Sequence, residues 1–84
     1  MTIIVMNVIV ATYEHPHGRD TRVFSNEKAA EDWRHDIAAQ WWEAEMQGAP
    51  PANREQMADE YFDAMCDRER EWFTAETMPV EDAI

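Results

Sequence analysis

The chain has 84 residues, which is enough for one hydrophobic core and too few for two. Hydrophobic residues make up 45% of the sequence, which argues against wholesale disorder, and the single cysteine, Cys66, excludes an intramolecular disulfide and a multi-thiolate metal site. The formal net charge of −11 disfavours direct binding to nucleic acid or to an anionic membrane and favours basic protein partners. We therefore expect one α+β domain spanning residues 1–84, soluble and in the reducing environment of a cytoplasm.

The N-terminal segment predicts a β-hairpin over residues 2–25. Residues 2–13 are rich in β-branched side chains and contain neither Gly nor Pro, which favours a long strand. This apolar run is too short for a membrane span and lacks the basic flank and cleavage site of a signal peptide. Pro16 and Gly18 then indicate a turn, and Val23 and Phe24 indicate the returning strand.

A first helix is expected over residues 26–47. Ser25 is a suitable N-cap, and Gly48 is a suitable stop. Apolar side chains recur at three- and four-residue spacing and predict the face that points inward: Ala29, Ala30, Trp33, Ile37, Trp41 and Ala44. This orientation places Trp42 on the opposite, outward side of the helix.

A second helix is expected over residues 53–73, after the break at Pro50 and Pro51. Asn53 is its predicted N-cap, with Gln56 three residues later. Its inner face is predicted to carry Met57, Tyr61, Ala64, Met65, Arg68 and Trp72. Residues 74–84 show no clear period, so we expect a tail that is either a loose arm or a short edge strand.

These elements predict a hairpin packed against two helices, in the order ββαα, with a possible short third strand from the tail. Both faces of the first strand are largely apolar, and two helices are expected to cover only one of them. Either the tail completes the cover, or the open face or free edge pairs with a second copy of the chain. A homo-oligomeric structural or adaptor module is therefore one candidate function.

Negative charge is concentrated in the predicted helices, because residues 1–25 carry no net charge and residues 26–84 carry all of it. Acidic residues fall at three- and four-residue spacing, which places them in a row on one face of each helix. Like charges at this spacing destabilise a helix, so the rows fit either a solvated face or a docking surface for a basic protein. Trp42, flanked by acids, is a candidate interface anchor. The predicted partner-binding residues are Asp32, Asp36, Trp42, Glu43, Glu60, Asp63, Asp67 and Glu71.

The sequence predicts neither an enzyme nor a cofactor. It has no Gly-rich phosphate loop and no signature of an activated Ser or Cys. His15 and His17, with Glu14 or Asp20, could offer three metal ligands, but no second His/Cys cluster supports them and turns use these residues for ordinary hydrogen bonding. We therefore predict no metal site and consider a partner-contacting or pH-sensitive turn the better hypothesis.

In size, charge and layout, a short hairpin followed by acidic helices, the chain resembles small phage and mobile-element inhibitors, in particular anti-CRISPR proteins. The resemblance covers most of the chain and includes no diagnostic motif. It implies a stoichiometric inhibitor in the host cytoplasm that mimics DNA, binds the Lys/Arg-lined groove of an effector complex and excludes target DNA. The acidic residues of the predicted set would then occupy phosphate positions, and Trp42 would anchor the contact. Antitoxins and nuclease inhibitors share this profile.

Overall fold

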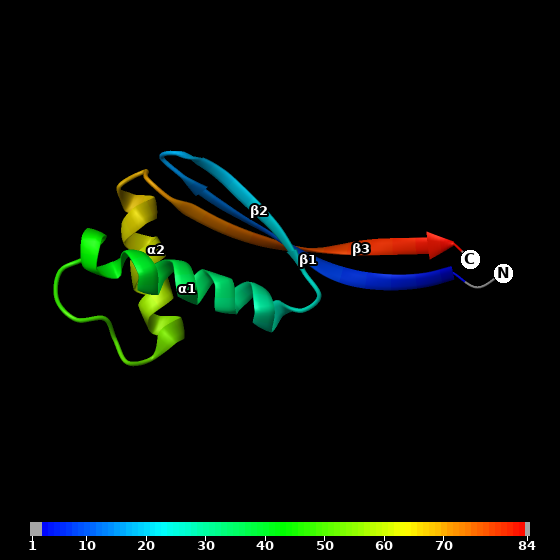
Figure 1. The fold of residues 1–84 in the computed structure, drawn as a ribbon, viewed down its shortest axis with the longest axis horizontal. Helices are drawn as coiled ribbons and strands as arrows, with labels where there is room; N and C mark the ends of the chain where they lie inside the picture. The colour runs from blue at the N-terminus through cyan, green and yellow to red at the C-terminus, as the bar shows by residue number, and fades with distance from the viewer. Residues whose placement is uncertain (1–2, 84) are drawn as a thin grey trace.

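The computed structural model describes residues 3–83, and the side chains of residues 7–80. Three antiparallel strands form one sheet in the order β2-β1-β3, from β1 (Ile3–His15), β2 (Gly18–Phe24) and β3 (Trp72–Ala83). Two helices, α1 (Glu27–Glu45) and α2 (Arg54–Asp67), lie on one side of this sheet (Figure 1). The α+β class is confirmed, and the element order is ββααβ.

The predicted hairpin is present. β1 pairs with β2 from Ile9↔Phe24 to His15↔Gly18, and the turn between them holds Pro16 and His17. Gly18 has a φ of 145°, a conformation that side chains with a Cβ rarely adopt, so glycine suits the point where the chain leaves the turn.

The C-terminal tail forms an edge strand of 12 residues, whereas the sequence predicted either a loose arm or a short edge strand. β3 begins at Trp72, two residues before the predicted tail, and pairs with β1 from Glu14↔Trp72 to Ile3↔Ala83. The paired residues lie between 58 positions apart, for Glu14 and Trp72, and 80 positions apart, for Ile3 and Ala83. Strand formation depends mainly on such cross-strand neighbours, so local periodicity carries little signal for it.

Helix α2 ends at Asp67, so its predicted extension to residue 73 was wrong. Arg68 is the C-cap, and Glu69 adopts a left-handed φ of 55°. The N–H groups of Glu69 and Arg70 donate to the carbonyls of Cys66 and Met65, the paired bonds of a Schellman motif. Because Glu69 occupies the position where glycine is usual, the sequence contains no visible stop signal.

The two helices begin at asparagine caps. The Asn53 side chain accepts a hydrogen bond from the Gln56 N–H at 2.9 Å, as predicted. In α1 the cap is Asn26, which accepts from the Ala29 N–H at 2.9 Å, and the predicted cap Ser25 lies one residue earlier. Helix α1 also stops at Glu45, before the predicted end at residue 47.

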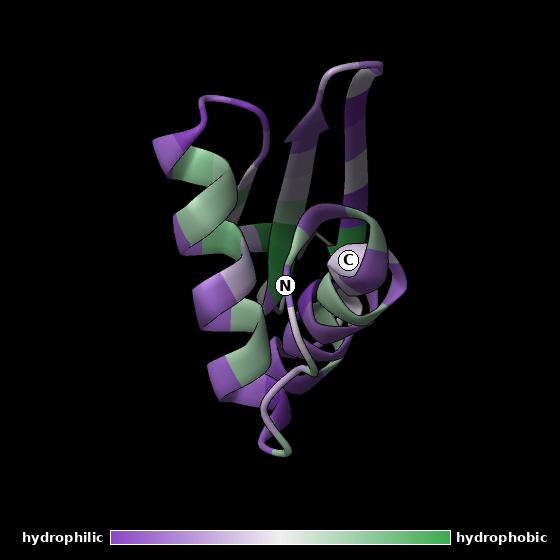
Figure 2. Cartoon of the chain, turned by 90° about the vertical axis from the view of Figure 1, so that its left-hand side faces the viewer, coloured by the Kyte–Doolittle hydropathy of each residue, from purple (hydrophilic) through white to green (hydrophobic). Residues whose placement is uncertain are grey.

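The core lies between the sheet and the helices. Figure 2 shows apolar and polar segments alternating along both helices, as expected for helices with one buried stripe. Aromatic rings pack at its centre, with centroids 6.4 Å apart for Tyr13 and Trp33, 5.5 Å for Trp33 and Phe73, and 5.6 Å for Phe62 and Phe73. Within residues 7–15 of β1, the buried residues are Ile9, Ala11 and Tyr13, which point to one face because they alternate along the strand.

The molecule is elongated, because β1 and β3 continue as a two-stranded ribbon beyond β2 and the helices (Figure 1). Its extents are 57 × 27 × 17 Å, and its radius of gyration is 15.6 Å. A compact domain of this length would have a radius of gyration of about 12 Å. Within residues 3–83, no helix is long and apolar enough to cross a membrane.

Candidate functional site

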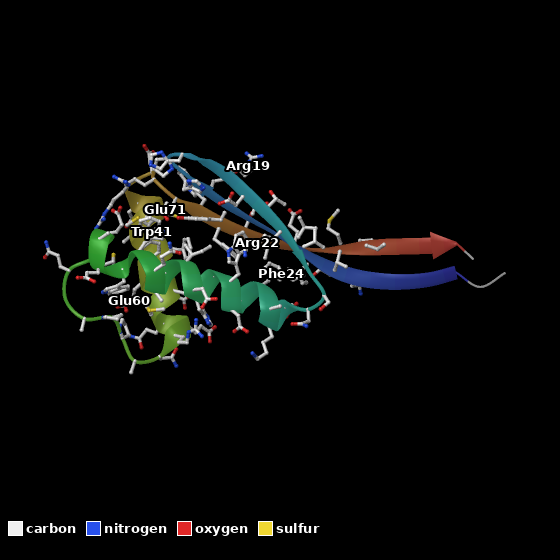
Figure 3. All side chains as sticks on the ribbon, viewed as in Figure 1. Arg19, Arg22, Phe24, Trp41, Glu60 and Glu71 are labelled. Atoms are coloured by element: carbon white, nitrogen blue, oxygen red, sulfur yellow. The ribbon has the colours of Figure 1, made fainter. Side chains whose placement is uncertain are left out.

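Three acidic residues of the predicted set form an exposed row on α2. Glu60, Asp63 and Asp67 are all exposed, and Glu60 lies on the helical side of the molecule, away from the strands (Figure 3). Among the described side chains, none of the three carboxylates lies within 4.0 Å of a basic group. We call these three residues the α2 acidic row.

The basic residues of the chain neutralise other acids. Six of the seven Lys and Arg side chains form ion pairs, and the remaining one, Arg22, lies 4.6 Å from the centroid of the Trp33 ring. The pairs are Arg19 with Glu14, Lys28 with Asp32, Arg34 with Glu31 and Asp59, Arg54 with Asp36, and Arg68 and Arg70 with Glu45. The α2 acidic row is therefore left without compensation.

In the predicted row on α1, two acids form ion pairs and the third does not. Lys28 of the same helix lies 3.1 Å from Asp32, and Arg54 at the start of α2 lies 2.6 Å from Asp36. Glu43 is exposed, and no ion pair is present at its carboxylate among the described residues. Asp32 is thus paired within α1 and Asp36 with the start of α2, so these two acids do not form an uncompensated row with Glu43.

Glu71 does not belong to the acidic row. It lies in the connection between α2 and β3, only 4% exposed, with its carboxylate directed into the protein near the hairpin tip (Figure 3). One oxygen accepts a hydrogen bond from the Tyr13 hydroxyl, and both accept from the Tyr61 hydroxyl at 2.9 Å. Its prediction as a partner-binding residue was wrong because α2 ends before reaching it.

Burial beside the Glu71 carboxylate makes the hydroxyls of Tyr13 and Tyr61 weaker acids. Burial and, next in size, the hydrogen bond to Glu71 raise the pKa of Tyr13 and that of Tyr61 well above the ordinary value. Both hydroxyls therefore remain protonated donors at neutral pH. This arrangement satisfies a buried charge and joins β1, α2 and the start of β3.

Trp42 is buried, so its predicted role as an exposed anchor was wrong. It is 6% exposed, and its Nε1 donates to the Gly48 carbonyl at 2.9 Å, which ties the loop after α1 to the helix. Its neighbour Trp41 is 42% exposed instead (Figure 3). The helical spacing of Ala30, Trp33 and Ile37 favours Trp41 as the next inward residue. Trp42 is buried all the same because the loop after α1 packs on that side of the helix, a contact that spacing within the helix does not reveal.

A groove lies between the hairpin tip and the C-terminal half of α1, and the sequence did not indicate it. Two adjoining hollows share Tyr13, His15, His17 and Trp41 as lining residues. His15 Nε2 lies 3.2 Å from Asp20 Oδ2, and its Nδ1 accepts from the His17 N–H at 3.2 Å. Both ring nitrogens of His15 are thus engaged within the turn, and residues 7–80 contain no cluster of three His, Cys, Asp or Glu placed to hold a metal.

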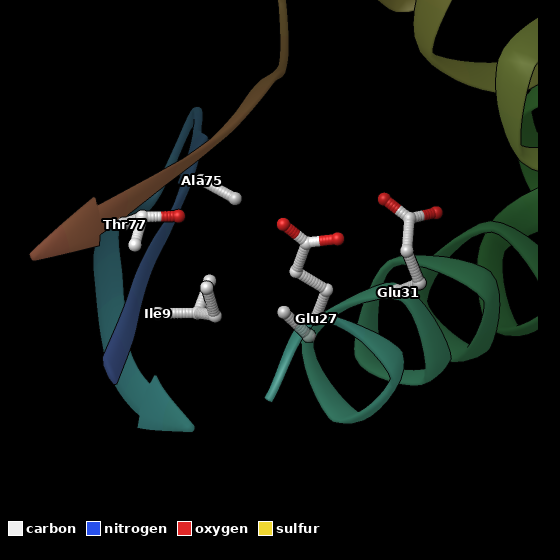
Figure 4. A pocket seen from close by; sticks show the side chains of 6 residues that line it. Ile9, Glu27, Glu31, Ala75 and Thr77 are labelled. Carbon is white, nitrogen blue, oxygen red and sulfur yellow. The ribbon is translucent and has the colours of Figure 1, made fainter. Parts of the chain in front are cut away.

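A separate hollow, of about 150 Å³, lies between the first turns of α1 and the sheet (Figure 4). Glu27 and Glu31 extend toward it from α1, opposite Ala75 and Thr77 of β3. Glu31 also lies 3.5 Å from both Arg34 and His35. The hollow is smaller than the roughly 300–1,000 Å³ typical of ligand sites.

Comparison of the chain with models of protein families gave no match, and neither did searches among curated proteins and solved structures. The charges and the burial of its own side chains are therefore what bear on its function.

Proposed function

We propose that the chain is a stoichiometric protein inhibitor that docks the α2 acidic row on a basic, nucleic-acid-binding surface of another protein. The proposal rests on one observation: six of the seven basic side chains form ion pairs with other acids, and none pairs with Glu60, Asp63 or Asp67. Complementary charge supplies orientation and fast association in such contacts.

The spacing of the row is comparable to that of a nucleic-acid strand. At 1.5 Å rise per residue, three carboxylates over residues 60–67 place roughly one charge per 5 Å of helix axis, and a DNA strand carries about one per 3.4 Å. Like charges at this spacing cost the helix about 0.2–0.5 kcal/mol per pair. A Lys/Arg-lined groove would relieve that repulsion by facing the row.

Glu43 is the member of the α1 set that has no ion pair among the described side chains, so it would not have to exchange a cation to contact the partner. Asp32 and Asp36 would first have to exchange Lys28 and Arg54 for cations of the partner. The docking surface therefore centres on α2. The resemblance to anti-CRISPR proteins suggests a CRISPR effector complex as the target, with the chain excluding target DNA from its groove.

A DNA-binding competition assay tests the proposal. A panel of purified CRISPR effector complexes is mixed with labelled target DNA and with either the wild-type chain or the variant E60Q/D63N/D67N. The matched control, E27Q/E55Q/E76Q, removes the same number of exposed carboxylates elsewhere, none of them in an ion pair among the described side chains. We expect wild type and control to displace DNA from one complex with a potency that falls as salt rises, and the α2 variant to lose most of this potency.

Equal potency of the two triple variants, or inhibition that does not depend on salt, would contradict docking through α2. Failure to displace DNA from any complex in the panel would contradict the effector target.

A further inference from the structure

The face of the sheet opposite the helices is uncovered within the described part of the chain. Because Ile9, Ala11 and Tyr13 point toward the helices, the alternate residues Val8 and Val10 point the other way. Residues that lie opposite one another in neighbouring strands share a face, so this second face continues into β2 and β3. We call it the open face.

The open face carries four of the five large apolar side chains that residues 7–80 expose. They are Val23, Trp72, Met78 and Val80, with exposed fractions of 63%, 40%, 44% and 40%. Val23 pairs with Val10, Met78 pairs with Val8, and Trp72 pairs with Glu14, which places them on this face. Val23, Met78 and Val80 lie beside Val8 and Val10, whereas Thr12 and Thr74 separate them from Trp72. An exposed apolar surface of this kind usually marks an interface.

At residues 7–8 and 78–80, where the ribbon leaves the helices, the two faces of the ribbon differ. On its open face lie Val8, Met78 and Val80, whereas the opposite face there shows Asn7 and Pro79, both exposed. No helix reaches this part of the ribbon to require an apolar side. An isolated two-stranded ribbon is marginal in water, so packing on the apolar side would stabilise it.

The distribution of charge indicates which kind of partner covers the open face. The described part of the open face carries three charged side chains: Glu14, Arg19 and Glu76. Glu14 and Arg19 form an ion pair at 2.9 Å, so the net charge of this part of the face comes from Glu76 alone. Nearly all of the −11 therefore lies elsewhere. A basic partner would be attracted to the acidic helices and not to this face. Two copies of so acidic a chain repel one another least when their near-neutral open faces meet, because the helices are then farthest apart.

We propose that two copies of the chain pack their open faces together across a twofold axis. The dimer has four layers, helices, sheet, sheet and helices, with the sheets about 10 Å apart and with Val23 and Met78 of each copy in the contact. It leaves the α2 acidic row exposed on both outer surfaces. The inference is independent of the proposed inhibitory function.

Sedimentation equilibrium of the purified chain tests the proposal over the micromolar concentration range. We expect a mass of twice 9.9 kDa at high concentration, and tighter association as salt rises, because salt screens the repulsion between acidic copies. Docking of the acidic row on a basic protein has the opposite salt dependence. The two proposals can therefore fail separately.

The variant V23K/M78K should be monomeric at every concentration. Its matched control, A39K/A44K, adds the same two charges at exposed positions of α1 and should remain dimeric. A wild-type chain that stays monomeric throughout, or a V23K/M78K variant that dimerises like the control, would overturn the proposal.

NMR of the wild-type chain provides a test that does not depend on the folding of a variant. On dilution, the amide signals of Val10, Val23 and Met78 should shift, and those of Glu60 and Asp63 should not. Shifts confined to α2 would assign the contact to the helices and overturn the proposed interface.

Discussion

The Tyr61 hydroxyl lies 2.9 Å from each carboxylate oxygen of Glu71, and neither residue is exposed. This contact joins the middle of α2 to the residue just before β3. It holds the chain where the helix ends and the third strand begins. A carboxylate that lies only four residues beyond the α2 acidic row therefore stabilises the fold and is not available to a partner.

Replacing Glu71 with alanine should lower the free energy of unfolding by about 2–4 kcal/mol. The change leaves the hydroxyls of Tyr13 and Tyr61 buried without their acceptor and opens a small cavity. Urea denaturation followed by circular dichroism measures the loss. The control Asp67→Ala removes an exposed carboxylate and should stay within about 0.5 kcal/mol of wild type; similar losses in the two variants would contradict a structural role for Glu71.

The tyrosines should resist ionisation. Their pKa values are raised in the folded state, so the stability that this shift contributes is complete below the ordinary tyrosine pKa of about 10 and is lost as pH rises above it. Absorbance at alkaline pH should show little tyrosinate until the protein unfolds. In Glu71→Gln both pKa values should fall toward, but stay above, the ordinary value, because burial is the larger cause; tyrosinate at ordinary pH in the folded wild type would contradict this.

The two adjacent tryptophans should respond differently to substitution. Trp42→Phe loses the hydrogen bond to the Gly48 carbonyl and part of a buried ring, and we expect it to cost about 1–2 kcal/mol of unfolding free energy. Trp41→Phe alters an exposed side chain and should cost less than about 0.5 kcal/mol. Thermal and urea unfolding of both variants gives the comparison. The reverse order would indicate that the buried face of α1 has been assigned to the wrong tryptophan.

The N-terminal cap of α1 can be located by mutation. Asn26→Ala removes the acceptor of the Ala29 N–H and should cost about 1 kcal/mol, whereas Ser25→Ala should change the unfolding free energy by only a few tenths. Urea denaturation resolves the difference. A larger loss from Ser25→Ala would place the cap at Ser25, as the sequence pattern predicted.

Several elements could be predicted because their signals are local. The hairpin follows from β-branched residues around Pro16 and Gly18, and the start of α2 follows from Asn53, because turn and cap preferences depend on neighbouring residues. Within the candidate site, the exposure of Glu60, Asp63 and Asp67 follows from helical spacing.

Only the tertiary structure decided the rest. β3 forms because β1 offers a partner strand far away along the chain. Helix α2 ends at Asp67 because Glu69, which is not a glycine, adopts a left-handed conformation two residues later. Trp42 is buried because the loop after α1 folds back on it. In the sequence, Glu71 has the spacing of a further acid in the α2 row. In the fold, its carboxylate accepts hydrogen bonds from Tyr13 of β1 and Tyr61 of α2. The sequence by itself determined how much negative charge the helices carry, because charge depends on composition. Packing determined which carboxylates remain uncompensated at the surface, because that depends on contacts between residues far apart along the chain.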